Sequence, residues 1–415
     1  MANDRKRRKI RIVKPIKIKE KNPVNKPVSE EGSKAYNSNK LKVVSGTRKK
    51  RKIIGIITYS IIALIFITII VLNILSPTGL IESIQNAIAA GGNGSLPQNV
   101  YSVNPEYMNC YNDVCAIIND SYFELYSSKG KLINAVSHGM SSPRLEYSEA
   151  RYLLYDSDRY KVTVFNYSDE LYSREFDKTI VSADIGRNGT FSVVTDSDSF
   201  HNTVYVYNKK NELIFTWNSA QYYVTDVALS DDGKSIAVSL LNSVEGKFES
   251  FIYILDMKKA TPKFSYKLND IVSSITSCGK QYFIVNGFDR AYSIPWSGGA
   301  ENDLNISGII RCYANNVDGV SCVVSGRQDN EQVNKITVCN QNGSVISSVD
   351  FKSVVYDVSL SESAICILSE NEVYVYDFKG NLLNNFNFGF KGKFVGIFDT
   401  DNVFVLDNTK LNSVH

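Results

Sequence analysis

The sequence predicts an all-β protein: an eight-bladed β-propeller of four-stranded antiparallel blades, preceded by one transmembrane helix and a disordered basic tail. Three observations lead to this prediction. An uncharged apolar run of 23 residues begins at Ile53 and ends at Leu75. A repeat of about 41 residues recurs from residue 98 onwards. Residues 1–52 carry 19 Lys and Arg against 4 Asp and Glu, whereas the rest of the chain has a net charge of −12.

The apolar run has the length of a transmembrane helix. At a rise of about 1.5 Å per residue it spans about 34 Å, enough for a hydrocarbon core of about 30 Å. A cleaved signal peptide would have a shorter apolar core near the N-terminus, whereas here 52 residues precede the run. The basic residues at 48–52 are retained on the cytoplasmic side. We therefore expect a signal anchor in the cell membrane, with everything after Leu75 extracytoplasmic.

The segments on either side of the span differ in character. The tail, 1–52, is polar, basic and interrupted by prolines, so we expect it to be disordered and to rest on anionic lipid. A docking peptide for a cytoplasmic partner is the alternative. We expect no nucleic-acid binding, because no aromatic residue lies near the basic run at 5–9. In the juxtamembrane segment, 76–97, a short amphipathic helix from 79 to 90 precedes a flexible Gly-rich linker that sets the propeller off from the bilayer.

The domain from 98 to 415 is built from a repeated double hairpin. The clearest copy, at 224–239, reads VTDVALSDDGKSIAVS: a strand, an Asp-Gly turn and a second strand. Most units continue with a second hairpin, as in EVYVYDFKGNLLNNF at 372–386. Four short strands in about 41 residues are the size of a propeller blade, and neighbouring blades bury each other's faces.

The number of turns indicates the number of blades. Eight turn centres suggest eight blades, and the last unit is too short to supply four strands. The spare strand at 99–103 is expected to complete that blade and to close the ring, which leaves no long exposed edge. Seven blades are the alternative, if the unit near residue 401 is only a closing pair of strands.

One octapeptide carries a resemblance to known repeats. SDDGKSIA, at 230–237, resembles the S-x-D-G-K-x-I-A hairpin of WD40-like and TolB-type propellers, although the Trp-Asp ends of WD40 repeats are missing. The order of basic tail, single span, Gly-rich linker and Tyr-rich propeller is similar to that of the DUF5711 family of Firmicutes membrane proteins. That resemblance implies a membrane-anchored propeller and brings no known function with it.

The sequence contains no recognisable catalytic or ligand-binding motif. The histidines, His138, His201 and His415, form no metal-binding spacing with one another or with the cysteines. No G-x-S-x-G elbow is present, and the glycines at 91–94 lack the Lys-Ser/Thr of a phosphate loop. We therefore expect no catalytic residue, no metal, no cofactor and no enzymatic activity.

The seven cysteines allow one disulfide. If residues 112–113 form a two-residue turn, Cys110 and Cys115 are a non-hydrogen-bonded pair with Cα atoms about 4.5 Å apart, which a disulfide can bridge. The alternative is that all seven are free thiols.

These features favour a binding or scaffold module for an envelope protein or a cell-wall glycan. The long connections 196–203, 241–250, 297–304 and 326–334 are the candidate binding rim. The alternative is a propeller enzyme, either a glycan lyase with clustered His, Tyr and Arg or a quinoprotein-like oxidoreductase.

Overall fold

The computed structural model of the protein describes residues 46–316 and 318–414. Helix α1 (Gly46–Leu75) contains the predicted span. Its stretch Lys52–Ile74 is long and apolar enough to cross a membrane. The predicted disordered tail lies outside the described residues as far as residue 45, and residues 46–52 already form the first turns of α1.

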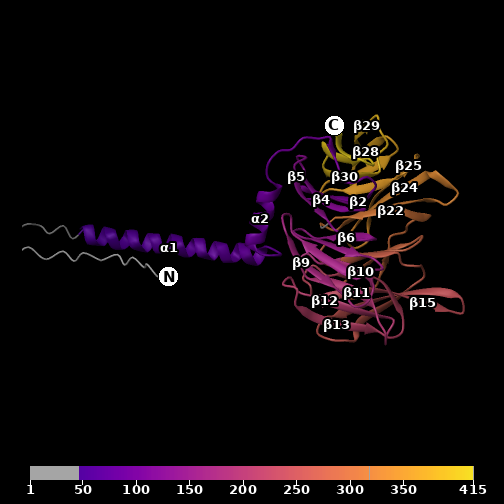
Figure 1. Cartoon of the computed structure of the whole chain (residues 1–415), viewed down its shortest axis with the longest axis horizontal. Helices are drawn as coiled ribbons and strands as arrows, with labels where there is room; N and C mark the ends of the chain where they lie inside the picture. The colour runs from indigo at the N-terminus through magenta and orange to yellow at the C-terminus, as the bar shows by residue number, and fades with distance from the viewer. Residues whose placement is uncertain (1–45, 317, 415) are drawn as a thin grey trace, which may run out of the picture. The chain divides into compact units, whose positions relative to one another are not determined.

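The described residues from 98 onwards form eight four-stranded antiparallel sheets, which are the blades of a propeller (Figure 1). This confirms the predicted eight-bladed fold. Each of seven blades consists of four strands that are consecutive in the chain. Within a blade, we call the strand nearest the propeller axis the first strand and the outermost one the fourth. In the eighth blade, the outermost strand comes from the other end of the domain.

The strands of blades 1 to 4 are β2 (Pro105–Tyr111), β3 (Val114–Asn119), β4 (Tyr122–Ser127), β5 (Leu132–Ser137); β6 (Pro143–Tyr147), β7 (Tyr152–Asp156), β8 (Lys161–Phe165), β9 (Glu170–Glu175); β10 (Ile180–Ile185), β11 (Phe191–Asp196), β12 (Asn202–Tyr207), β13 (Leu213–Ser219); and β14 (Tyr223–Leu229), β15 (Ser235–Val244), β16 (Lys247–Asp256), β17 (Pro262–Leu268). Those of blades 5 to 8 are β18 (Ser274–Cys278), β19 (Tyr282–Asn286), β20 (Ala291–Pro295), β21 (Asn302–Asp303); β22 (Ile309–Asn315), β23 (Val320–Arg327), β24 (Asn330–Asn340), β25 (Val345–Phe351); β26 (Asp357–Leu360), β27 (Ala364–Ser369), β28 (Glu372–Asp377), β29 (Leu382–Asn387); and β30 (Phe394–Asp399), β31 (Asn402–Leu406), β32 (Lys410–Val414), β1 (Gln98–Asn99).

An N-terminal strand closes the ring, as the sequence predicts. Strand β1 pairs antiparallel with β32, so that Gln98 lies opposite Leu411. The pairing covers 98–99, whereas the sequence predicts 99–103. The chain turns away earlier because the N–H of Tyr101 donates to the carboxylate of Glu124 in blade 1, at 3.0 Å. Blade 1, in indigo to purple, lies beside the yellow strands of blade 8 (Figure 1).

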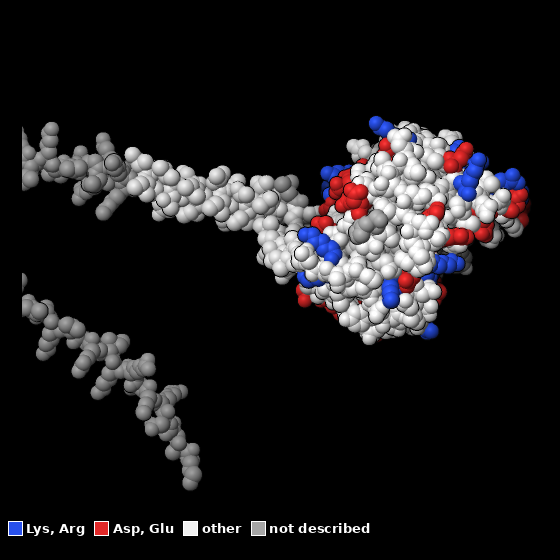
Figure 2. Space-filling model, turned by 90° about the horizontal axis from the view of Figure 1, so that it is seen from above, with Lys and Arg blue, Asp and Glu red and all other residues white. Residues whose placement is uncertain are grey.

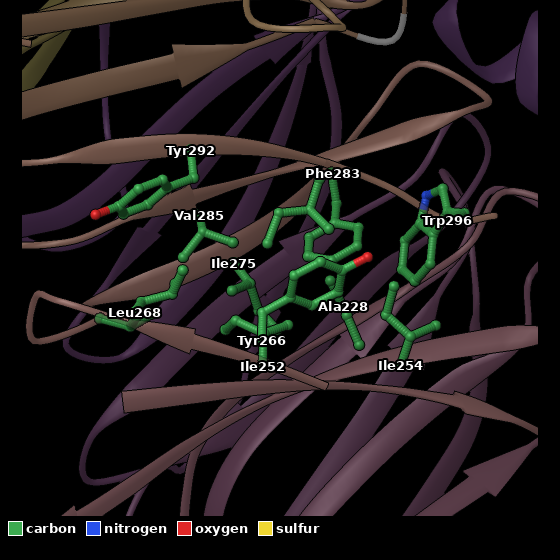
Figure 3. Close-up of a cluster of buried hydrophobic side chains, with 13 residues drawn as sticks. Ala228, Ile252, Ile254, Tyr266, Leu268, Ile275, Phe283, Val285, Tyr292 and Trp296 are labelled. Atoms are coloured by element: carbon green, nitrogen blue, oxygen red, sulfur yellow. The ribbon is translucent and has the colours of Figure 1, made fainter. Parts of the chain in front are cut away.

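The core lies between the blades. The described residues form eight apolar clusters, and each draws its side chains from two neighbouring blades. Figure 3 shows the cluster between blades 4 and 5, in which Ile252 and Tyr266 face Phe283 and Trp296. Burying apolar side chains in this way contributes about 25 cal/mol per Å² of apolar surface. A single blade cannot bury both faces, which is why the repeats fold as a closed ring.

The Asp-Gly hairpin shows why the repeat has its sequence. Gly233 has a φ of 65°, which side-chain-bearing residues rarely adopt, and its N–H donates to the carbonyl of Ser230 at 2.8 Å. The neighbouring turn uses Asn188, whose Nδ2 donates to the carbonyl of Asp232 at 3.1 Å. The turns of adjacent blades are therefore joined to each other.

The propeller has two different faces. Because the strands of each blade are antiparallel, the turns between first and second strands, and between third and fourth strands, lie on one face, which we call the turn face. The connections between second and third strands, and those between blades, lie on the opposite face, which we call the loop face. The β15–β16 hairpin extends from the loop face (Figure 1).

Helix α2 (Leu80–Ala90) packs on the turn face. The side-chain amide of Asn86 donates to the carbonyl of Ala150 at 2.9 Å and accepts the N–H of Tyr167 at 3.1 Å. Both partners belong to blade 2 and its turns. The short helix predicted at 79–90 is thus present, and it is attached to the propeller.

The Gly-rich segment after α2 differs from the expected flexible linker. The ammonium of Lys131 donates to the carbonyls of Ala89, at 3.0 Å, and of Gly91, at 2.7 Å. The N–H of Gly94 donates to the carbonyl of Lys129 at 3.0 Å. The segment therefore lies along blade 1 instead of separating it from α2.

Candidate functional site

The first strands of the blades surround a central channel with a cavity of about 420 Å³. Five carboxylic acids line this cavity, and Arg144 is the one basic residue among the described residues that line it. The channel is therefore acidic. The five acids are Glu106, Glu146, Asp184, Asp226 and Asp357.

Channel carboxylates join neighbouring blades. Asp226, in blade 4, accepts the N–H of Ile275 in blade 5 at 2.8 Å and the hydroxyl of Ser182 in blade 3 at 2.7 Å. Asp357, in blade 7, accepts the N–H of Val395 in blade 8 at 2.9 Å. An oxygen of each side chain thus satisfies a backbone donor that the neighbouring first strand leaves free. These two acids have a structural role.

Burial changes the ionisation of these acids. It raises the pKa of Asp184 and of Asp357 to about 7, and that of Asp226 to about 6. Burial, followed by the negative charges of Asp184 and Asp226, raises the pKa of Glu146 well above its ordinary value. All four side chains are only half-buried by accessible surface, because they border the channel. Near neutral pH the channel can both donate and accept hydrogen bonds.

Tyrosines complete the polar lining of the channel. Tyr107, Tyr147 and Tyr313 all line the cavity. Burial raises the pKa of each phenol, to about 12 for Tyr147. The phenols are therefore neutral hydroxyl groups at physiological pH and act as hydrogen-bonding groups.

The described histidines lie away from the channel. His138 Nε2 is 3.0 Å from the carbonyl oxygen of Asn119, and its Nδ1 accepts the N–H of Met140 at 3.0 Å. The ring centroid of His201 lies 4.2 Å from that of Tyr223. His415 lies outside the described residues. Within 46–316 and 318–414, no group of three or more His, Cys, Asp or Glu side chains is placed to hold a metal ion.

The loop face exposes large apolar side chains from many different connections. Each has more than two fifths of its surface exposed, and aromatic rings predominate. On the side of the molecule that Figure 2 shows, acidic and basic side chains are interspersed, with broad uncharged areas between them. The exposed apolar residues of the loop face are Tyr101, Val103, Tyr160, Phe200, Tyr223, Val244, Phe248, Ile271, Phe288, Val333 and Tyr356.

A depression of about 520 Å³ lies on the loop face beside blades 7 and 8. Tyr356 and Phe390 form its apolar lining, and Glu370 and Asn371 supply polar groups. The ammonium of Lys391 lies 5.2 Å from the ring centroid of Tyr356. Aromatic rings beside amide, carboxylate and ammonium groups can stack on a ligand and hydrogen-bond to its edge.

The structure separates the four connections that the sequence singles out. Those at 196–203, 241–250 and 326–334 join second to third strands and lie on the loop face. The connection at 297–304 joins β20 to β21, so its turn lies on the opposite, turn face. Length alone did not distinguish the two kinds of connection.

Cys110 and Cys115 lie directly opposite each other in the β2–β3 hairpin. The two-residue turn places Tyr111 opposite Val114, in the register expected from the sequence. Both thiols are buried, and the structure has them as free cysteines.

Sequence reasoning did not identify the channel carboxylates. A signal was present, because Asp226 in VTDVALS and Asp357 in YDVSLS occupy the same position of the repeat. A polar residue at a fixed position of the innermost strand is a candidate for lining the channel. Asp184 and Glu146 lie at other positions and give no such signal.

The comparisons with known proteins agree with this architecture. The family described as "Family of unknown function (DUF5711)" matches residues 97–415. The chain belongs to the DUF5711 family. A comparison with curated proteins found no match. The family assignment confirms the resemblance drawn from the sequence, and it covers the propeller without α1.

Solved propellers resemble this DUF5711 protein in fold. The C-terminal WD40 domain of Sif2 superposes with a TM-score of 0.54 at 11% identity, covering 78% of this chain and 99% of that one. Saccharomyces cerevisiae Sqt1 gives 0.55 at 11% identity, covering 78% and 100%. At such low identity the likeness concerns the fold alone.

Proposed function

We propose that this DUF5711 protein is a membrane-anchored binding module whose loop face holds an envelope protein or a cell-wall glycan. The exposed aromatic side chains of the loop face carry the proposal. Soluble domains seldom expose many large apolar side chains on one face, and tyrosine and phenylalanine are typical anchors of binding interfaces.

The proposed location of the propeller, outside the cell membrane, is argued from α1 and from the basic residues before its apolar stretch. This stretch is suited to a membrane anchor, and basic residues precede it at 48–52. By the positive-inside rule the N-terminus is cytoplasmic and the propeller lies outside the cell membrane. The basic tail would rest on anionic lipid of the inner leaflet. Helix α2 occupies the turn face, which leaves the loop face free for a partner.

We propose a role without catalysis. In the channel, Arg144 lies among tyrosines and carboxylic acids. The two described histidines lie outside the channel, where His138 is hydrogen-bonded and His201 lies against a tyrosine ring. The channel acids Asp226 and Asp357 are already used in joining blades. A lyase-like centre would require a base and an acid aimed at one substrate position.

Photocrosslinking in living cells tests the proposal. A photoreactive phenylalanine replaces Phe248 or Phe288, which are 61% and 55% exposed on the loop face. The matched control replaces Leu213 or Leu382, which are 53% and 52% exposed where outer strands leave the turn face. We expect adducts to an envelope protein from the loop-face positions and not from the controls. Equal labelling at both pairs would contradict the proposal.

A glycan partner would escape protein crosslinking and needs its own measurement. The full chain in detergent is applied to a cell-wall glycan array, beside the double variant Tyr356→Ala/Phe390→Ala. Loss of glycan binding in the variant would place the glycan in the depression. Absence of both adducts and glycan binding would overturn the proposed function.

A further inference from the structure

Helix α2 turns Glu82 and Asn86 towards the propeller and three isoleucines away from it. Ile81, Ile84 and Ile88 are 73%, 50% and 72% exposed. Their spacing of three and four residues places them on one face of the helix, which we call the isoleucine stripe. On the inner side, Glu82 is paired with Arg151 and Asn86 is hydrogen-bonded to the propeller.

This arrangement is the reverse of the usual one. A helix on the surface of a soluble domain buries its apolar stripe against the core and exposes its charges. Here the inner contacts are the ion pair of Glu82, the amide hydrogen bonds of Asn86 and the packing of Ala89 and Ala90 against the cluster between blades 1 and 2. The isoleucine stripe takes no part in attaching α2 to the propeller. Three exposed isoleucines on one face of an eleven-residue helix therefore favour an apolar environment outside the domain.

We infer that the isoleucine stripe lies in the interfacial region of the bilayer that α1 crosses. The inference rests on the anchoring role proposed for α1. The four residues 76–79 separate the two helices and reach at most about 14 Å. If α1 crosses the bilayer, this short connection keeps α2 close to the membrane. The bilayer is then the apolar phase nearest to the isoleucine stripe. An amphipathic helix in such a position buries its apolar face about 5–10 Å into the boundary between headgroups and acyl chains.

The charges around α2 suit a lipid surface. The one acidic residue of the helix, Glu82, is neutralised by Arg151. The ammonium of Lys131 contacts the C-terminal end of the helix, and that of Lys209 lies 3.4 Å from the carbonyl of Thr78, just before its start. Exposed lysines on the same two turns, Lys129 and Lys210, remain available to anionic headgroups.

A bilayer-embedded α2 would also orient the propeller. Because α2 is attached to blades 1 to 3 through the turn face, the embedded stripe would hold the turn face towards the membrane. The loop face with its aromatic side chains would then point away from the membrane. The anchor would orient the binding surface as well as retain it.

Depth-dependent quenching in nanodiscs tests the inference on the full chain. An environment-sensitive fluorophore is attached to a cysteine at one of three positions: Ile84→Cys on the stripe, Leu64→Cys in α1, and Phe248→Cys on the loop face. The unsubstituted chain reports the background from its native cysteines, of which six are buried. The lipids carry bromine either near the carbonyl end or near the methyl end of the acyl chain.

The expected pattern differs at each position. The label at Ile84 should be quenched more by bromine near the carbonyl end, that at Leu64 more by bromine near the methyl end, and that at Phe248 by neither. Quenching at Leu64 without quenching at Ile84 would overturn the inference and leave the anchoring role intact. A blue-shifted but unquenched label at Ile84 would also overturn it, because a protein partner would then cover the stripe. Absence of quenching at Leu64 would refute the anchoring role and, with it, the inference.

Discussion

Arg151 holds helix α2 to the propeller through the carboxylate of Glu82. Its Nε and Nη2 each donate to one carboxylate oxygen at 2.7 Å, and its Nη1 donates to the carbonyl of Lys209 at 2.9 Å. The side chains are only 5% and 13% exposed. Bidentate pairs of this kind are among the stronger charge-assisted hydrogen bonds. One guanidinium thus joins blade 2, blade 3 and α2.

Removing Glu82 should destabilise the whole domain. Glu82→Ala leaves the Arg151 guanidinium buried without its counter-charge, and we expect the free energy of unfolding to fall by about 3–5 kcal/mol. Denaturant titration of the detergent-solubilised chain, followed by tryptophan fluorescence, measures the change. Asp198→Ala is the matched control, because the pair of Asp198 with Lys178 is exposed and should leave stability unchanged. An equal effect of the two substitutions would contradict the structural role of the buried pair.

The stability of the propeller should decrease as the pH rises from about 4 to about 7. The pKa of Asp357 is raised by burial from 3.8 to about 7, so the folded state holds this proton more tightly than the unfolded state does. The stability that protonated Asp357 contributes is complete below its pKa in the unfolded chain. That stability is lost as the pH rises through the pKa of Asp357 in the folded protein. A tenfold difference in proton affinity between the folded and unfolded states corresponds to about 1.4 kcal/mol.

The substitution Asp357→Asn should remove that part of the pH dependence. The amide oxygen can still accept the N–H of Val395, so the variant should be more stable than the parent at pH 8 and similar at low pH. Thermal unfolding across the pH range measures this. Asp329→Asn is the control: hydrogen bonding by Arg327 lowers the pKa of Asp329, so it stays ionised over this range. Parallel pH profiles for Asp357→Asn and the parent chain would show that Asp357 does not titrate there.

Gly396 should be intolerant of a side chain. A Cβ at this position would lie 2.8 Å from the Cβ of Cys110 and 3.2 Å from the Cε of Met108, across the contact of blade 8 with blade 1. We expect Gly396→Ala to cost about 1–3 kcal/mol through overpacking. Gly389→Ala, where a Cβ would meet no atom within 4 Å, is the matched control and should leave the melting temperature unchanged. Two variants of equal stability would mean that the blade contact relaxes easily.

Cys110 and Cys115 should form a disulfide when the protein is made in an oxidising compartment. Their opposed positions in the hairpin satisfy the geometric requirement. Mass spectrometry of protein that is unfolded and alkylated without reduction should find this pair linked, while the separated cysteines Cys312 and Cys366 carry the alkyl group. Full alkylation of all seven cysteines after unfolding would show that the pair is reduced in the protein as made.

Much of the fold could be predicted because it depends on residues close together in the chain. The Asp-Gly turn around Gly233 requires a positive φ, and the alternating strands beside it require burial on both faces. Repeating that unit eight times yields the blade count and the need for a closing strand. The limits of that strand were less predictable, because the contact of Tyr101 with Glu124 ends it.

The candidate sites were less predictable. Asp226 and Asp357 become channel residues only because eight first strands converge on one axis, and their pKa values rise only once that axis is enclosed. The exposed Phe248 and Tyr356 are separated by more than a hundred residues, and the ring brings them to the same face. The Gly-rich segment reads as a linker until Lys131 is seen to bind the end of α2.

The apolar span, the strand-turn-strand repeat and the number of blades are specified locally, because each depends on the order of residues within a few turns of chain. The ring itself was needed to establish which face carries the aromatic side chains, which acids share the channel, and which way α2 turns its isoleucines. Those properties depend on partners distant in the chain: Ile275 is 49 residues from Asp226, and Arg151 is 69 residues from Glu82. The repeat marks Asp226 as a residue of the innermost strand, but it does not specify the distant partners of these groups, because such contacts form only when the ring has closed.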